Sequence, residues 1–155
     1  MWERRTSVYS YEILWRAAHS ALQMAEIQDS RVRPDHLSIH STLTGFLAFE
    51  GFVNLVGAQI APNIWSQERD FFSRGQFRGI LGKVDYLFTL FSGTLDKGIE
   101  PYQTVRRIKQ TRDHLAHNRV HSYGEITEDK NPSFRTKWDD FDTPEKVLPA
   151  LQRLK

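Results

Sequence analysis

Residues 43–60 read LTGFLAFEGFVNLVGAQI and carry the clearest fold signal in the chain. Mostly apolar residues recur there at steps of three and four, which places them on one face of a helix. The stripe consists of Leu43, Phe46, Leu47, Glu50, Val53, Asn54, Gly57 and Ile60. With Pro62 as its end, the stretch predicts a long helix over residues 35–61. Gly45, Gly51 and Gly57 each weaken a helix by roughly 1 kcal/mol relative to alanine, so we expect a neighbouring helix to approach closely there.

Three more long helices are predicted on either side of this one. Residues 8–28 and 77–92 have the same periodic apolar stripe, and a helix over residues 101–120 begins near Pro101, a favourable first-turn residue. A short helix is predicted over residues 63–72. No stretch alternates convincingly as a strand over the first 120 positions.

Long helices joined by short connections predict an all-α fold, an antiparallel four- to five-helix bundle. The 155 residues suffice for one domain spanning 1–155, with the bundle core at about residues 8–121. Residues 122–155 are mostly polar and are predicted to be an irregular tail. A short helix is expected after Pro144, its length limited by Pro149.

The composition predicts a folded, soluble protein. Apolar residues make up 39% and aromatic residues 12% of the chain, which argues against disorder. Cysteine is absent, which excludes disulfides, thiolate metal sites and a cysteine nucleophile. His36, His40, Glu50 and Asn54 interrupt the most apolar region, so we expect no membrane-spanning segment. No signal peptide is recognisable, and we expect a cytoplasmic protein.

Charge is distributed unevenly although the formal net charge is only +2. Residues 101–121 contain five basic residues and one acid, whereas residues 122–145 contain seven acids and three basic residues. A basic helix beside an acidic segment indicates either a polyanionic partner or pairing between the two segments. Two ordinary solvated faces would produce the same distribution.

Two charged residues interrupt otherwise apolar stripes. Arg112 follows Val105 and Ile108 on the last long helix, and Glu50 lies in the middle of the 43–60 stripe, one turn before Asn54. Burial of an unpaired charge is costly. We therefore expect Arg112 and Glu50 either to pair inside the bundle, as a structural ion pair, or to face a solvated cleft.

The segment 111–118 reads TRDHLAHN and resembles the signature of the HEPN superfamily. An arginine (Arg112), four intervening residues and a histidine (His117) stand near the end of the last core helix, with a polar residue, Asp113, directly after the arginine. The stretch 49–54, FEGFVN, is similar to the second helix of that family, which often has an acid and an asparagine there. The resemblance covers about residues 8–121.

The resemblance implies a metal-independent endoribonuclease that leaves a 2′,3′-cyclic phosphate and needs no cofactor. Arg112 and His117 would be the catalytic pair, and Asp113 an orienting group, in a homodimer whose last core helices meet across a twofold axis. The supporting residues would be Glu50, Asn54 and His114, and the RNA-binding residues Arg106, Lys109 and Arg119. Many members are toxins with an antitoxin or other protein partner. The subgroup paired with nucleotidyltransferase-like antitoxins has a tyrosine where this chain has Arg119.

The residues themselves are suited to that chemistry. Positions five apart on a helix point about 140° apart, so Arg112 and His117 cannot share one narrow face. A site composed of residues from two copies would bring them together. Histidine titrates near neutral pH and can move a proton to or from a ribose oxygen. The arginine fork matches phosphate oxygens.

Two other classes of function remain open. One is a HEPN-like dimer that binds a protein or nucleic-acid partner and catalyses nothing. The other is a metal site, because His114, His117 and His121 are spaced i, i+3 and i+7 on one helix face. No second ligand cluster completes such a site in the sequence, so we expect no metal.

Overall fold

The computed structural model describes residues 9–27, 34–116 and 143–154, and within these ranges every regular element is a helix. The helices are α1 (Ser10–Glu26), α2 (Pro34–Ile60), α3 (Pro62–Trp65), α4 (Glu68–Phe71), α5 (Gly79–Leu90), α6 (Tyr102–Ala116) and α7 (Pro144–Leu154). The predicted all-α class is therefore confirmed. The four long predicted helices correspond to α1, α2, α5 and α6, and the short helix predicted over 63–72 is two short helices, α3 and α4.

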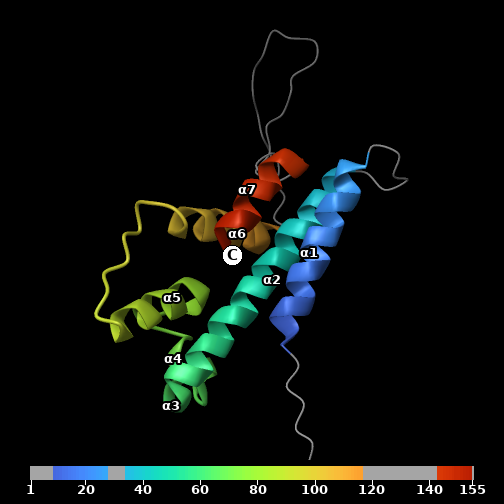
Figure 1. Cartoon of the computed structure of the whole chain (residues 1–155). Coiled ribbons are helices and arrows are strands. Elements are labelled where there is room, and N and C mark those ends of the chain that lie inside the picture. The colour runs from blue at the N-terminus through green and yellow to red at the C-terminus, as the bar shows by residue number, and fades with distance from the viewer. Residues whose placement is uncertain (1–8, 28–33, 117–142, 155) are drawn as a thin grey trace, which may run out of the picture.

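Helix α2 is the centre of the fold. It contacts α1, α3, α5, α6 and α7. In Figure 1, α1 and α2 lie side by side along their length, whereas α5 and α6 run across α2. The largest fully buried apolar side chains come from three helices: Phe46 on α2, Ile108 on α6, and Val147 and Leu151 on α7.

The glycines of α2 allow close approach by neighbouring helices. A Cβ at Gly45 would lie 2.3 Å from a methyl carbon of Leu151, and one at Gly57 would lie 1.9 Å from the indole of Trp65. At Gly51 the nearest neighbour is the Cβ of Tyr11, at 3.2 Å. These contacts confirm the expected close approach, although the partner at Gly57 is a side chain from the short helix α3.

The helix expected after Pro144 is confirmed as α7, which packs against α1, α2 and α6, so residues 144–154 are not part of an irregular tail. Pro149 does not limit this helix, which continues to Leu154. Proline removes one helical hydrogen bond. Complete burial of Val147 and Leu151 supplies roughly 1.5–3 kcal/mol for each side chain, which offsets that loss.

The expectation that the chain has no membrane-spanning segment stays a prediction. The stretch His36–Ile60 is long and apolar enough to cross a bilayer by length and composition alone, with a mean hydropathy of 1.3. Core helices of soluble proteins meet the same two criteria. His40, Glu50 and Asn54 interrupt this stretch, but they do not lower its mean hydropathy enough to exclude it as a membrane span by composition.

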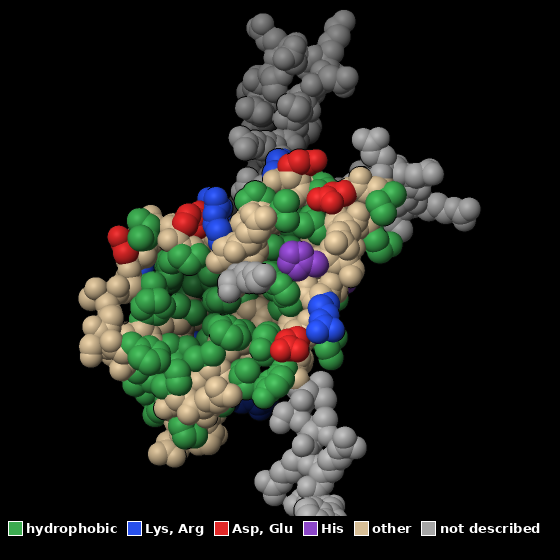
Figure 2. Space-filling view, in the orientation of Figure 1, with side chains coloured by type: hydrophobic (Ala, Val, Ile, Leu, Met, Phe, Trp, Pro, Cys, Tyr) green, Lys and Arg blue, Asp and Glu red, His purple; other side chains and the backbone are tan. Residues whose placement is uncertain are grey.

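Apolar side chains gather on the face of the molecule that covers α5 and the adjoining part of α2 (Figure 2). Large exposed apolar residues of α5 include Phe88 and Leu90, which are each 43% exposed. Just after α5, Phe91 is 67% exposed. Contiguous exposed apolar surface is uncommon on monomeric soluble proteins and is typical of interaction sites.

Candidate functional site

The packing of α6 on α2 places Arg112 beside the apolar core. Val105 and Ile108 are 5% and 0% exposed, and they lie two turns and one turn before Arg112 on the same face of α6. The Arg112 side chain continues this seam but is 34% exposed. Its stem is therefore packed against the core while part of its guanidinium reaches the surface.

The guanidinium of Arg112 lies over the ring of Phe46 on α2. The distance from the guanidinium carbon to the ring centroid is 5.2 Å, and Phe46 is fully buried. A cation over an aromatic face is attracted by the ring quadrupole, with roughly 0.5–2 kcal/mol depending on desolvation. The Nε atom of Arg112 is buried and has no hydrogen-bond partner among the residues that the structure describes. The Phe46 ring therefore limits the positions that the guanidinium can adopt.

Asp113 contacts two cations at once. Its Oδ1 lies 3.0 Å from Arg112 Nη1, and its Oδ2 accepts a hydrogen bond from Lys109 Nζ, one helical turn earlier on α6. The three side chains are between 31% and 34% exposed. The carboxylate therefore contacts one nitrogen of the arginine fork.

Glu50 does not pair with Arg112. No ion pair joins these two residues, and among the described residues Glu50 has no salt-bridge partner. Glu50 is half-buried on α2, one turn beyond Phe46. The buried structural ion pair that the sequence allowed is thus absent, and Arg112 packs against an aromatic ring instead.

Asn54 belongs to a different cluster. Its Oδ1 accepts hydrogen bonds from the ammonium of Lys83 at 2.8 Å and from the indole N–H of Trp65 at 3.4 Å. Lys83 is 5% exposed and also pairs with Glu68. Asn54 is eight residues beyond Phe46, a rise of about 12 Å along α2. It therefore lies away from Arg112 and ties α2 to α3 and α5.

The other predicted site residues are only partly described. Arg106 is exposed on α6, and His114 is half-buried near the end of that helix. His117, Arg119 and His121 lie outside the described residues. Among the residues described, no three histidine or acidic side chains are grouped as metal ligands would be. The structure thus brings together Lys109, Arg112 and Asp113.

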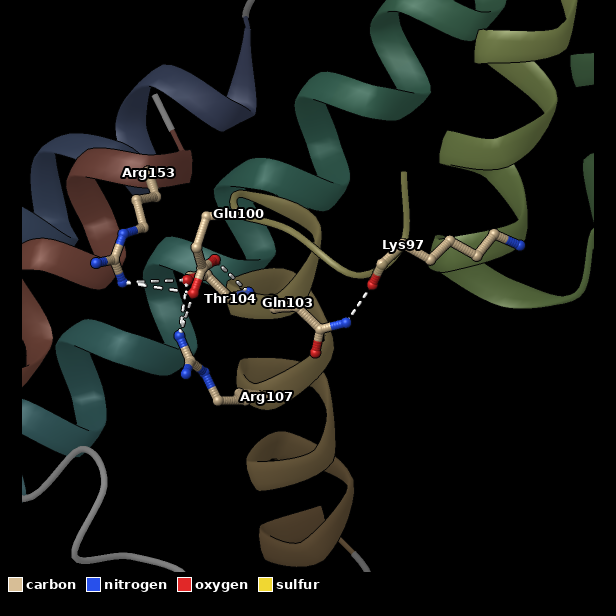
Figure 3. Close-up of polar contacts among 6 residues, drawn as sticks. All are labelled: Lys97, Glu100, Gln103, Thr104, Arg107 and Arg153. Atoms are coloured by element: carbon tan, nitrogen blue, oxygen red, sulfur yellow. Dashed lines mark hydrogen bonds and ion pairs between the residues drawn. The ribbon is translucent and has the colours of Figure 1, made fainter. Parts of the chain in front are cut away.

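The sequence reasoning missed a polar cluster at the start of α6 (Figure 3). Glu100 accepts a hydrogen bond from the backbone N–H of Thr104 at 2.8 Å, and its other oxygen lies 2.6 Å from Arg107 Nη2. Arg153 of α7 lies 3.8 Å from that same oxygen and 3.4 Å from the Thr104 hydroxyl. The cluster joins the start of α6 to the end of α7. The sequence feature that could have indicated it is an acid directly before Pro101, because acidic residues are favourable at the start of a helix.

Hydrogen bonding to Thr104, joined by the charges of Arg107 and Arg153, lowers the pKa of Glu100 despite the opposing effect of burial. The carboxylate thus remains charged to lower pH than an isolated glutamate. Gln103 donates a hydrogen bond to the carbonyl of Lys97, and Lys97 pairs with Asp85 on α5 at 2.6 Å. These contacts connect the segment between α5 and α6 to both helices.

Two of the hollows on the described surface are not lined by α6. One, of about 220 Å³, is apolar and lies between α1, α2 and the end of α7. The other, of about 340 Å³, lies beside α5 and the segment that follows it. Arg112 therefore does not line either of these hollows.

Comparison with protein families, with curated proteins and with solved structures finds no match to this chain.

Proposed function

We propose that this protein is a HEPN-like antiparallel helical bundle acting as a metal-independent endoribonuclease. The observation that carries the proposal is the position of Arg112: a guanidinium held over Phe46, oriented by Asp113, one third exposed and not paired with Glu50. An arginine serving only as an internal ion pair would have a buried acidic partner. Here the cation is fixed in place and still reaches solvent.

The proposed reaction is attack by the ribose 2′-oxygen on the adjacent phosphorus. The 2′-O–P bond forms, the bond from phosphorus to the 5′-oxygen breaks, and the products are a 2′,3′-cyclic phosphate and a 5′-hydroxyl. His117 accepts the 2′-hydroxyl proton, and a histidine protonates the leaving 5′-oxygen. Arg112 stabilises the negative charge that accumulates on the phosphoryl oxygens.

The proposed site is composite. Arg112 and His117 are five residues apart and diverge by about 140° on an ideal helix, so one copy cannot easily direct both at one phosphate. We propose a twofold homodimer in which each phosphate meets residues of both copies. In this dimer the two copies of His117 divide the roles of base and acid. Arg106, Lys109 and Arg119 bind the RNA backbone, and the cell uses the enzyme as a toxin or defence effector controlled by a partner protein.

The decisive experiment is cleavage of mixed RNA by the purified protein in excess EDTA. RNA should be cut while the matching DNA, which lacks the 2′-hydroxyl, survives. The products should end in cyclic phosphates. Loss of cleavage in EDTA with recovery on addition of a divalent ion would contradict the proposal, and so would equal cleavage of DNA.

A second candidate function is favoured by one specific observation, the exposed apolar face over α5 and α2 (Figure 2). Such a face suits a protein partner. In that case the chain would be a catalytically inactive HEPN-like binding module. The RNA cleavage assay distinguishes the two functions, because an inactive module would leave RNA intact at any protein concentration.

A further inference from the structure

Lys109, Asp113 and Arg112 form a compact charged group on α6. Each oxygen of the single carboxylate has its own cation, with Lys109 on Oδ2 and Arg112 on Oδ1. The three side chains have similar exposure, between 31% and 34%. The carboxylate is thus the anion on which two positive groups from adjacent turns converge.

A phosphodiester offers the same two cations a comparable ligand. Carboxylates and phosphates both present paired oxygens, and both bind arginine and lysine through charge-assisted hydrogen bonds. The group carries two positive charges and one negative charge. A phosphodiester replacing the carboxylate would therefore be bound by both cations, with the displaced Asp113 side chain turned toward solvent.

The two cations would stay in place during such an exchange. Phe46 covers one face of the Arg112 guanidinium and is fully buried, so the ring restricts its movement. The backbone of Lys109 is held in α6 one turn before Asp113, so its ammonium stays within reach of the same position. Asp113 has the shortest side chain of the three and needs only a rotation about its own bonds to leave.

We propose that Asp113 is an intramolecular competitor of the RNA phosphate, occupying in the RNA-free protein the position between Lys109 and Arg112 that a phosphodiester takes on binding. The inference rests on the proposed ribonuclease function, which it extends by naming the binding residues and a built-in restraint on affinity. Asp113 keeps the two cations together and at the same time lowers the affinity for RNA.

The test measures binding without cleavage. The probe is a fluorescent, fully 2′-O-methylated RNA decamer, which cannot be cut by attack of a 2′-hydroxyl. Asp113→Asn should bind it about 2- to 10-fold more tightly than the wild type, because two partly exposed ion pairs no longer compete. Lys109→Gln should bind more weakly and reduce the slope of log K against log salt by about 1.

A matched control separates this site from the general effect of charge. Asp70→Asn makes the same change in net charge at an exposed position on α4. It should leave binding of the decamer within about 2-fold of wild type, because a remote, screened charge contributes little. In the double variant Lys109→Gln with Asp113→Asn, the gain from the asparagine should be smaller than in the single variant. Melting curves establish that each variant is folded.

The outcomes separate this inference from the proposed function. Asp113→Asn binding no tighter than Asp70→Asn, or no binding by any variant, would overturn the inference, even if the wild type cleaves ordinary RNA. Tighter binding by Asp113→Asn in a protein that never cleaves RNA would support the phosphate site and reject the nuclease.

Discussion

The guanidinium carbon of Arg112 lies 5.2 Å from the ring centroid of Phe46, although these residues are on different helices and 66 positions apart in the chain. Phe46 is fully buried, so the packing of α6 on α2 determines where the cation is held. Glu50, the acid one turn away on the same helix, does not contact it. Arg112 therefore has an aromatic neighbour on α2 in place of an ionic one.

Arg112→Lys should lower RNA cleavage by about 100-fold or more, because lysine keeps the charge but loses the planar fork that holds a phosphoryl group. The melting temperature should change little. The measurement is single-turnover cleavage beside a thermal melt, with Arg16→Lys at an exposed position on α1 as control. An Arg112→Lys protein that cleaves at the wild-type rate would refute a catalytic role.

Glu50→Gln should not rescue Arg112→Ala. A buried ion pair would leave an uncompensated carboxylate when its arginine is removed, at a cost of roughly 3–5 kcal/mol, part of which Glu50→Gln would recover. Because the two residues do not pair here, the effects of the two substitutions on unfolding free energy should add. Chemical denaturation of both single variants and the double variant measures this, and a coupling above about 1 kcal/mol would contradict the structure.

His117→Ala should reduce cleavage by about 100- to 10,000-fold while leaving the protein folded, since general acid–base catalysis typically contributes that much. His36→Ala, at an exposed position on α2, is the matched control and should retain full activity. Both proteins are assayed in EDTA. Retention of wild-type activity by His117→Ala would remove this residue from the mechanism.

The protein should be a dimer at micromolar concentration, because a site that uses Arg112 of one copy and His117 of the other requires two chains. Light scattering after size-exclusion chromatography should give twice the mass of a single chain. Adding an excess of His117→Ala chains to the wild type should lower the activity per wild-type chain, because a mixed dimer lacks one of the two histidines. A monomer, or activity per wild-type chain that stays constant in the mixture, would argue against the composite site.

The charged form of Glu100 should stabilise the folded protein at neutral pH, and this stabilisation should be lost in acid. The folded-state pKa of this carboxyl is lowered from its ordinary value of 4.5. Its contribution is therefore complete above about pH 4.5 and is lost as pH falls through the lower folded-state value. The melting temperature of Glu100→Gln should lie below that of wild type at pH 7, and the difference should shrink as the pH falls below about 4.5. A constant difference would contradict the assignment.

Gly57→Ala should destabilise the protein by about 1–3 kcal/mol despite the better helix propensity of alanine, because the new Cβ would overlap the buried indole of Trp65. Gly51→Ala is the control on the same helix, with its nearest neighbour at 3.2 Å, and should be much less harmful. Urea unfolding of both variants gives the comparison. Equal stability of the two would contradict the packing at Gly57.

The sequence by itself determined the helices that carry a periodic apolar stripe. Residues 8–28 and 35–61 were predicted as helices, and α1 and α2 differ from them by at most two residues at each end. Pro34 and Pro62 mark local breaks in any fold, because proline restricts its own backbone and that of the preceding residue. The sequence also singled out Arg112, since a cation in an apolar seam is costly wherever the helix packs.

Only the tertiary structure decided which faces meet. Periodicity assigns a residue to a face of its own helix but not to a neighbour on another helix. Asn54 therefore pairs with Lys83, and Arg112 packs on Phe46, although Glu50 and Asn54 shared the predicted stripe. The same reason explains α7. Its few apolar residues are a weak signal alone, but Leu151 fits the space above Gly45 and is fully buried, so the helix forms through contacts distant in sequence.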